Sequence, residues 1–254
     1  MYSDATTCDH LGKTSEHPIY LTLGNIPSWI RNKPDAKVLL GYLPQLKAKT
    51  ISQKKSKSFQ FAKRSLYHYA LDIVTRPILD YKTNGFDLQT NNTKLWCFPF
   101  ISVMLGDLPE NAAVTLTYNS INCNCPCHQC LLEGENLNNV ELTDRIILRT
   151  PENMKGFIEQ GLAQQYSLHN MENIFWKHSY LNIYTSIIPD RMHHLDLGLF
   201  NYQVTYTREM LKKLCGQIAV DDLDNRLAQI PRFSGFKLFK FGLGNIKRFT
   251  ADDF

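Results

Sequence analysis

The stretch LWCFPFISVMLGD, residues 95–107, is an almost continuous apolar run that ends in a carboxylate. A run of this kind suits a strand in the middle of a sheet, where other elements cover both faces. We therefore expect a buried central strand that ends at Asp107. Because the active sites of α/β folds gather at the carboxyl ends of strands, Asp107 is the first candidate for a functional residue.

Two apolar segments upstream of this run have the features of strands. Residues 17–26 are rich in β-branched and aromatic side chains and end in Gly-Asn, and residues 36–44 end at a proline. The lysine- and serine-rich residues 46–58 follow, and we expect a loop there. Residues 59–73 carry apolar side chains at helical spacing, and Pro77 predicts the end of that helix.

Helical patterns predominate downstream of the central strand, and a helix is expected directly after it. Residues 150–170 have a helical pattern, with Thr150 as the N-cap and Pro151 in the first position. Apolar residues from Phe200 keep a period of 3.6 residues to about Gly216. The order of strands, helix, strand and further helices predicts an α/β core with a largely helical C-terminal part.

The composition is that of an ordinary globular protein, with 43% hydrophobic and 20% charged residues among 254. This length allows one large domain or two small ones. No apolar run reaches the roughly 20 residues that a membrane span needs, and the N-terminus has no apolar signal segment, so we expect no membrane association. Seven cysteines without a secretory signal favour a reducing compartment over a disulfide framework.

Basic residues cluster in one part of the chain. The overall formal net charge is only +4, but residues 36–71 contain no aspartate or glutamate. A local basic run can bind the phosphate backbone of a nucleic acid, although a solvated surface loop has the same composition. The candidate DNA contacts in this run are Lys54, Lys55, Lys57, Lys63 and Arg64.

Two aspartates are candidates for catalysis. Asp4 lies just before the strand-rich region, and Asp107 ends the apolar run. Aspartates on neighbouring strands can bind divalent metal ions through oxygen ligands, and two such ions would stabilise the attacking and leaving oxygens of a phosphoryl displacement. For either residue alone, the alternative role is to cap a turn.

Four of the seven cysteines lie in NCNCPCHQC, residues 122–130. The spacing Cys127-x-x-Cys130 is that of a tight turn that directs two thiolates at one zinc ion. Such a site needs two further ligands. Cys123, Cys125 and His128 are near in sequence, but four ligands within eight residues would be crowded, so we favour His193 or His194 from a distant segment. The alternative is a reduced, cysteine-rich loop that binds no metal.

These histidines belong to PDRMHHLDLGLF, residues 189–200. Asp190 and His193 are three positions apart, so they share one face of a helix if the helix already begins there. Alternatively, Asp190 caps the helix and the histidines lie on its surface.

Four segments together resemble the Plavaka-type transposases of fungal genomes, relatives of the CACTA and Kyakuja–Dileera–Zisupton groups of cut-and-paste elements. The segments are YSDATTCDH (residues 2–10), HPIYLTLGNIPSWIRNKPDAKVLLGYLP (17–44), CFPFISVMLGDLPE (97–110) and PDRMHHLDLGLFNYQ (189–203). The resemblance runs nearly the whole length of the chain. Near the C-terminus, Phe249 and Asp253 stand where the family tends to have the Trp and Glu of a Trp-Thr-Gly-x-Glu motif.

The resemblance implies an RNase H-like mixed sheet and a DDE-type catalytic triad that uses two Mg²⁺ or Mn²⁺ ions. Asp4 and Asp107 match its first and second acids, and Asp190-x-x-His193 matches a motif between the second and third. Cys127 and Cys130 match a zinc half-site, which supports zinc shared with the later histidines. The implied partner is DNA, as transposon ends and target, and the implied location is the nucleus. The resemblance also allows a homo-oligomer.

By the same resemblance, residues 1–120 would be the catalytic core, and residues 121–254 a zinc-binding loop with a helical insertion that is incomplete at its C-terminus. Only three residues precede Asp4, so the first strand is shortened, and no residue matches the third acid convincingly. We therefore expect part of a transposase catalytic region that is inactive alone. The alternatives are a non-catalytic, zinc-stabilised remnant that binds nucleic acid or protein, and a fragment that does not fold stably.

Overall fold

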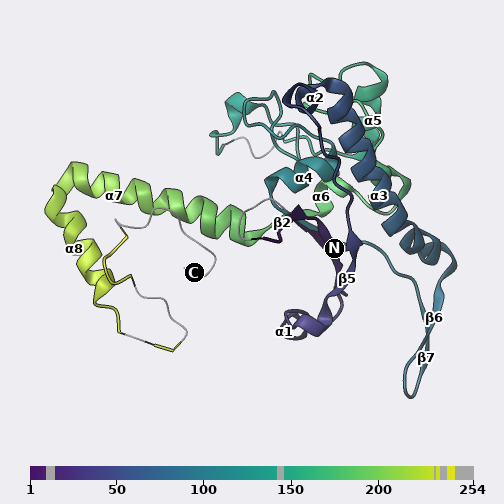
Figure 1. Cartoon of the computed structure of the whole chain (residues 1–254), viewed down its shortest axis with the longest axis horizontal. Helices are drawn as coiled ribbons and strands as arrows, with labels where there is room; N and C mark the ends of the chain where they lie inside the picture. The colour runs from purple at the N-terminus through teal and green to yellow at the C-terminus, as the bar shows by residue number, and fades with distance from the viewer. Residues whose placement is uncertain (10–14, 142–145, 232, 235–238, 244–254) are drawn as a thin grey trace. The chain divides into compact units, whose positions relative to one another are not determined.

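Five strands form one mixed sheet in the computed structural model, in the order β5-β4-β1-β8-β9 (Figure 1). The strands are β1 (Tyr2–Ser3), β4 (Pro18–Leu21), β5 (Val38–Tyr42), β8 (Met104–Gly106) and β9 (Ile187–Pro189). The pairs β1–β4 and β4–β5 are antiparallel, whereas β1 and β8 are parallel. The structure describes residues 1–9, 15–141, 146–231, 233–234 and 239–243.

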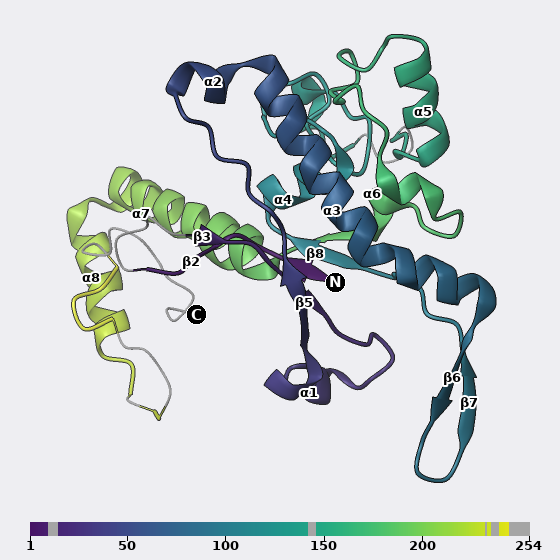
Figure 2. The ribbon, with the colours of Figure 1, turned by 45° about the vertical axis from the view of Figure 1, so that its right-hand side comes forward.

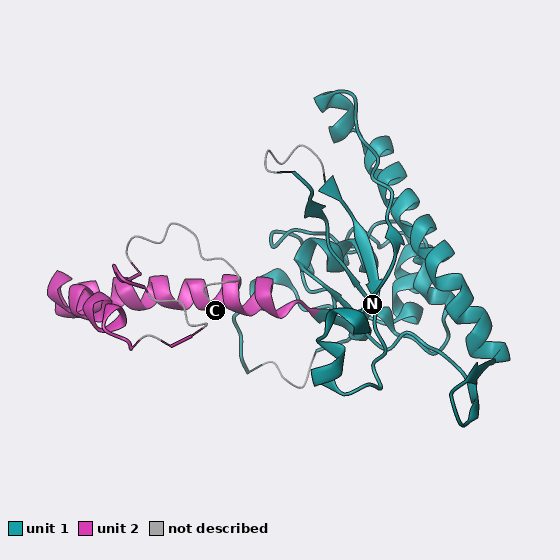
Figure 3. Ribbon diagram, turned by 60° about the horizontal axis from the view of Figure 1, so that its bottom comes forward, with its two compact units in different colours: residues 1–188 teal, residues 189–254 magenta. Residues whose placement is uncertain are grey.

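The chain divides into two compact units, unit 1 with residues 1–188 and unit 2 with residues 189–254 (Figure 3). The expected boundary at residue 120 therefore falls inside unit 1. The two predicted strands at residues 17–26 and 36–44 are confirmed as β4 and β5. A mixed sheet with helices also confirms the predicted α/β class.

The apolar run of residues 95–107 does not form one long strand. Its first part is β7 (Lys94–Cys97), which pairs with β6 (Phe86–Gln89) in a hairpin that projects from the body of unit 1 (Figures 1 and 2). Pro99 has no amide hydrogen for a strand ladder, and only β8 enters the sheet, between β1 and β9. The predicted central position of this strand in the sheet is confirmed. The predicted burial of both its faces is wrong, because Leu105 is 39% exposed.

The helix predicted for residues 59–73 is α3 (Lys57–Asn84), and Pro77 lies inside it. The predicted end at Pro77 is therefore wrong. Leu71 and Thr75 before the proline are buried, and Ile78 after it packs against the same core. Burial on both sides of Pro77 stabilises a continuous helix although the proline removes one hydrogen bond.

The predicted loop at residues 46–58 contains a further helix, α2 (Ile51–Lys55). The Thr50 side chain accepts a hydrogen bond from the Gln53 amide and caps α2, and Ser56 caps α3 in the same way through the Phe59 amide. Caps of this kind satisfy the amides that a helix start leaves without partners.

The core of unit 1 lies where α3 and the sheet meet the later helices. α4 (Leu108–Thr115) follows β8 as predicted, and α5 (Pro151–Glu159) begins at the predicted N-cap with a capping box at Thr150. α5 ends well before the predicted Asn170. The buried core residues include Ile19, Leu71, Met104, Val114, Met154, Phe175, Ile183 and Ile187.

Unit 1 also contains several smaller elements. They are the two-stranded pair β2 (Thr6–Thr7) and β3 (Ser15–Glu16), and the short helices α1 (Ser28–Arg31) and α6 (Ile183–Ser186). Among the described residues, no helix has both the length and the apolar character that crossing a membrane requires.

Unit 2 is helical in its described part. A π-helical segment, Met192–Phe200, leads into α7 (Asn201–Cys215), and α8 (Gln217–Ala228) follows. The predicted helix end near Gly216 is confirmed, since Gly216 has a φ of +81° that favours glycine. A Cβ at Gly198 would lie 2.7 Å from the carbonyl oxygen of His193, so the π-helical segment requires glycine there.

His68 gives the contact between α3 and α4 a dependence on pH. The residue is 3% exposed, and its Nε2 donates a 2.9 Å hydrogen bond to the Ala113 carbonyl. Burial lowers the pKa of His68 from 6.5 to about 4, so the folded state keeps the ring neutral. The unfolded chain binds a proton at this ring near pH 6.5, whereas the folded chain does so only near pH 4. The contribution of His68 to the free energy of unfolding is therefore complete above pH 6.5 and is lost as the pH falls toward 4.

We expect this histidine to account for a loss of about 3 kcal/mol of unfolding free energy between pH 6.5 and pH 4. In His68→Gln, the deficit relative to the wild type at pH 7 should therefore shrink as the pH falls. Urea unfolding followed by tryptophan fluorescence measures this, because Trp29, Trp96 and Trp176 all lie in unit 1. The control is Tyr69→Gln, at an exposed residue of α3. A His68→Gln deficit of equal size at pH 4 and pH 7 would contradict the prediction.

Candidate functional site

Asp4 and Asp107 lie at the same edge of the sheet. Asp4 directly follows β1, and Asp107 directly follows β8. In the parallel register of these strands, Tyr2 is opposite Leu105, so each aspartate lies two positions beyond the paired residue. Adjacent strands are about 4.8 Å apart, and the two aspartates therefore leave the sheet side by side.

The Asp107 carboxylate is oriented by α4. Its Oδ1 accepts a 2.8 Å hydrogen bond from the Glu110 amide, so Asp107 has a capping role, at a helix start and not at the turn that the sequence suggested. A carboxylate has about four acceptor sites, and capping uses one of them. Asp4 is held from its own strand, because the Tyr2 hydroxyl donates to Asp4 Oδ2 at 3.3 Å. Both aspartates are half-buried.

A buried polar network beside Asp107 is a feature that the sequence analysis missed. Glu110 Oε1 accepts hydrogen bonds from the Tyr67 hydroxyl at 2.5 Å and from His17 Nε2 at 3.2 Å. Burial raises the pKa of Tyr67 well above 10, and the charges of Glu110 and Asp107 raise it further, so the hydroxyl remains a donor. The network ties α4 to α3 and to the segment before β4, and thereby fixes the helix that Asp107 caps.

The only sequence signal for this network was Glu110, three residues after an N-cap aspartate. That spacing predicts a glutamate that bonds back to its own helix start. In the structure its carboxylate instead bonds Tyr67 and His17, which are 43 and 93 positions away. Contacts at such separations have no local signature.

The thiols of Cys127 and Cys130 meet in a tight turn, as the Cys-x-x-Cys spacing predicts. A hydrogen bond from the Cys130 thiol lowers the pKa of Cys127 to about 6, and the same bond raises the pKa of Cys130. The Gln129 amide also donates to Cys127 Sγ, at 3.4 Å. All seven cysteines are free thiols.

Arg149 holds the cysteine segment in place and was also missed. The residue is fully buried and bonds four backbone carbonyls in the interior of unit 1. Nε donates to the Cys127 and Cys130 carbonyls, Nη2 to that of Cys125 and Nη1 to that of Tyr166, at 2.9–3.0 Å. Burial lowers the pKa of this guanidinium. One side chain thus fixes the backbone on both sides of the Cys-x-x-Cys turn.

Asp190, His193 and His194 lie in unit 2, at and just before the π-helical segment. Asp190 Oδ2 accepts hydrogen bonds from the His193 amide at 3.1 Å and from His193 Nδ1 at 2.5 Å. Asp190 and His193 therefore do share a face, and Asp190 also bonds a backbone amide as a cap does. Of the residues predicted to bind zinc, the cysteines belong to unit 1 and the histidines to unit 2.

The basic candidates lie on α2 and the first turns of α3. Lys54, Lys55, Lys57 and Lys63 are exposed, whereas Arg64 is half-buried. Asp253 and Phe249, which were matched to the C-terminal family motif, lie outside the described residues. Within the described ranges, no three histidine, cysteine, aspartate or glutamate side chains are grouped as a metal ion requires.

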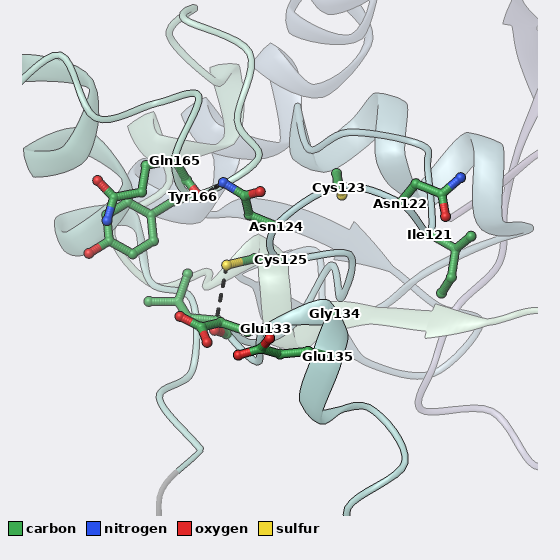
Figure 4. Close-up of a pocket in the computed structure, with 11 residues that line it drawn as sticks. Ile121, Asn122, Cys123, Asn124, Cys125, Glu133, Gly134, Glu135, Gln165 and Tyr166 are labelled. Atoms are coloured by element: carbon green, nitrogen blue, oxygen red, sulfur yellow. Dashed lines mark hydrogen bonds between the residues drawn. The ribbon is translucent and has the colours of Figure 1, made fainter.

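A cavity of about 680 Å³ lies beside the cysteine segment (Figure 4). Cys123 and Cys125 line it together with Glu133, Glu135 and Tyr166, and the Cys125 thiol donates to the Leu131 carbonyl at 3.6 Å. Burial raises the pKa of Cys125. The cavity includes neither of the two aspartates nor the Cys-x-x-Cys pair, so it is separate from both candidate centres.

A comparison with protein-family models finds one described as Plavaka transposase, which matches residues 1–207. No curated protein and no solved structure matches the chain.

Proposed function

The chain belongs to the Plavaka transposase family, and on that premise we propose that unit 1 carries part of a DDE-type catalytic region that cleaves and joins DNA. The main support for this proposal is that Asp4 and Asp107 lie side by side, each directly after one of two paired parallel strands. Two carboxylates side by side at a sheet edge form the oxygen donor set that Mg²⁺ or Mn²⁺ prefers.

The strand order also supports an RNase H-like fold for this region. Three strands, β1, β4 and β5, pair antiparallel in succession. After α3 and the β6–β7 hairpin, β8 returns parallel to β1 on its other side. This order is the one that the resemblance implies for an RNase H-like sheet, with the first acid after β1 and the second after β8.

In the proposed mechanism, Asp4 and Asp107 would hold the divalent ions, which when bound activate the attacking oxygen and stabilise the charge on the phosphodiester. The attacking group is water in strand cleavage and a DNA 3′-hydroxyl in strand transfer. Glu110 holds Tyr67 and His17 and keeps the helix capped by Asp107 in position. The exposed lysines of α2 and α3 would contact backbone phosphates. A DNA substrate is consistent with a nuclear location.

A second candidate function is a non-catalytic, zinc-stabilised module that binds nucleic acid or protein. The facing thiols of Cys127 and Cys130, held by the buried Arg149, support a structural zinc site that is independent of the aspartates. His193 and His194 are the proposed further ligands.

One experiment on the full chain separates the two functions. It measures Mn²⁺ binding, and the nicking of supercoiled plasmid in the presence of Mn²⁺, for the wild type and for Asp4→Asn. Mn²⁺ binding that depends on Asp4 supports the catalytic function. DNA binding and one tightly held zinc, with no Mn²⁺ bound by the aspartate, would instead favour the second candidate.

For the zinc site we expect one equivalent of zinc in chelator-washed protein, measured by elemental analysis. The double variant Cys127→Ser/Cys130→Ser should lose it, because serine is a poor zinc ligand, and His193→Ala should lose it as well. Cys215→Ser, at an exposed cysteine of α7, is the control and should keep its zinc. Soluble, folded wild-type protein without zinc would end this proposal.

A further inference from the structure

An aromatic pair lies on the surface at the far end of α4 from Asp107. The ring centroids of Tyr118 and His169 are 4.8 Å apart, and both side chains are half-exposed. An antiparallel bridge joins their chain segments: the Tyr118 amide donates to the Ser167 carbonyl, and the His169 amide donates to the Leu116 carbonyl. Two chain segments therefore present the two rings together.

The backbone beside this pair is strained. Leu116 and Ser167 have φ of +57° and +56°, and they are the non-glycine residues with positive φ in the described part of the chain. Each lies two positions before one of the two rings. A leucine rarely adopts this conformation, and such residues cluster at functional sites, where the surrounding structure holds them.

Arg64, on α3, acts electrostatically on the aromatic pair. Its charge acts on the Tyr118 hydroxyl and on His169, and burial lowers the pKa of Arg64 itself. Burial and then the Arg64 charge lower the pKa of His169 to about 4, so His169 is neutral at pH 7. Within the described ranges no carboxylate forms an ion pair with Arg64. A half-buried cation without a carboxylate gains stability from an anionic ligand.

Contacts between α3 and α4 connect this cluster with the candidate active site. Going along α4 from its start, Tyr67 bonds Glu110 and His68 bonds Ala113. The charge of Arg64, on the same helix as Tyr67 and His68, acts on Tyr118 just past the end of α4. Figure 2 shows the two helices side by side. α4 has eight residues and is therefore about 12 Å long, so its length separates Asp107 at its start from the cluster beyond its end.

We propose that Arg64, Tyr118 and His169 form a binding site for an unpaired nucleotide of the DNA strand, with Arg64 on the phosphate and the aromatic pair against the base. Every unpaired base can stack on an aromatic side chain, whereas the bases of a duplex are stacked on one another. The basic start of α3, at Lys57 and Lys63, continues this site along the same helix. The inference rests on the proposed function, because it assumes that DNA approaches Asp107.

The test compares a fluorescein-labelled oligothymidylate with a blunt duplex of the same length, by anisotropy at low salt with the full chain. Tyr118→Leu should weaken binding of the single strand about tenfold and change binding of the duplex less than twofold. Tyr118→Phe keeps the stacking face and should bind as the wild type does. Tyr69→Leu, at an exposed tyrosine of α3, is the matched control.

Arg64→Met should reduce the slope of log K against log salt for the single strand by about 0.7, the value for one phosphate contact. Equal affinities of Tyr118→Leu and wild type for the single strand would overturn the proposal. A loss by Tyr118→Leu that is equal for single strand and duplex would also overturn it, because it indicates a general structural effect. The proposed function fails separately, through absent Mn²⁺ binding at Asp4 and Asp107, which leaves single-strand binding unchanged.

Discussion

Replacing Asp107 with asparagine is expected to weaken Mn²⁺ binding by about 100-fold, and to abolish with it any Mn²⁺-dependent nicking of DNA. The expectation rests on the loss of one of two carboxylates at the sheet edge, since replacing even an outer partner of a metal ligand typically costs 10- to 100-fold. Asparagine caps a helix as well as aspartate does, so α4 and its packing should be retained. The variant therefore separates the metal-binding role of Asp107 from its capping role.

Isothermal titration with Mn²⁺ measures the affinity, and urea unfolding checks stability. Asp87→Asn is the matched control, because Asp87 is an exposed carboxylate on the projecting hairpin, paired only with Lys94 in the described contacts. We expect this control to bind Mn²⁺ like the wild type. If Asp107→Asn bound Mn²⁺ as tightly as the wild type, Asp107 would be a helix cap and no metal ligand.

Replacing Arg149 with methionine is expected to lower the unfolding free energy of unit 1 by about 4 kcal/mol or more. The side chain bonds four backbone carbonyls in the interior, and methionine would leave them without donors. Each buried acceptor without a partner costs about 1–3 kcal/mol. Arg149→Lys should recover only part of the loss, because an ammonium group cannot span four carbonyls as the guanidinium fork does.

Tryptophan fluorescence in urea measures this loss in unit 1, and zinc content measured in parallel shows whether the Cys-x-x-Cys turn keeps its shape. Arg31→Met is the control, because the half-exposed Arg31 side chain donates only to the Gly24 carbonyl among the described contacts. Its effect should be within about 0.5 kcal/mol. An Arg149→Met variant as stable as Arg31→Met would show that water replaces the lost donors.

Local patterns predicted the parts of the fold that depend on near neighbours. The starts of α4 and α5 and the end of α7 were foreseen, because a capping aspartate, a Thr-Pro pair and a glycine act within one helical turn. The strands β4 and β5 were foreseen from short runs of β-branched and aromatic residues. The position of Asp107 after a strand followed from the same patterns, whereas that of Asp4 followed only from the family resemblance.

Local patterns failed where packing between distant segments decided the outcome. Pro77 predicted a helix end, but burial of Leu71 on one side and packing of Ile78 on the other keep α3 continuous. The apolar run at residues 95–107 predicted one strand, yet most of it lies outside the sheet as half of a hairpin and the segment that follows. Hydrophobicity alone does not state which neighbour will cover a side chain.

The sequence by itself determined the α/β class, the family, and the residue types on which the proposed metal and DNA sites rest. Only the tertiary structure decided that Asp4 and Asp107 leave the sheet level with each other, and that Glu110 joins Tyr67 and His17. It alone showed that Arg149 holds the cysteine turn and that Tyr118 meets His169 beside Arg64. The reason is physical: capping and periodicity act within a few residues, whereas strand register and buried hydrogen bonds join groups tens of positions apart.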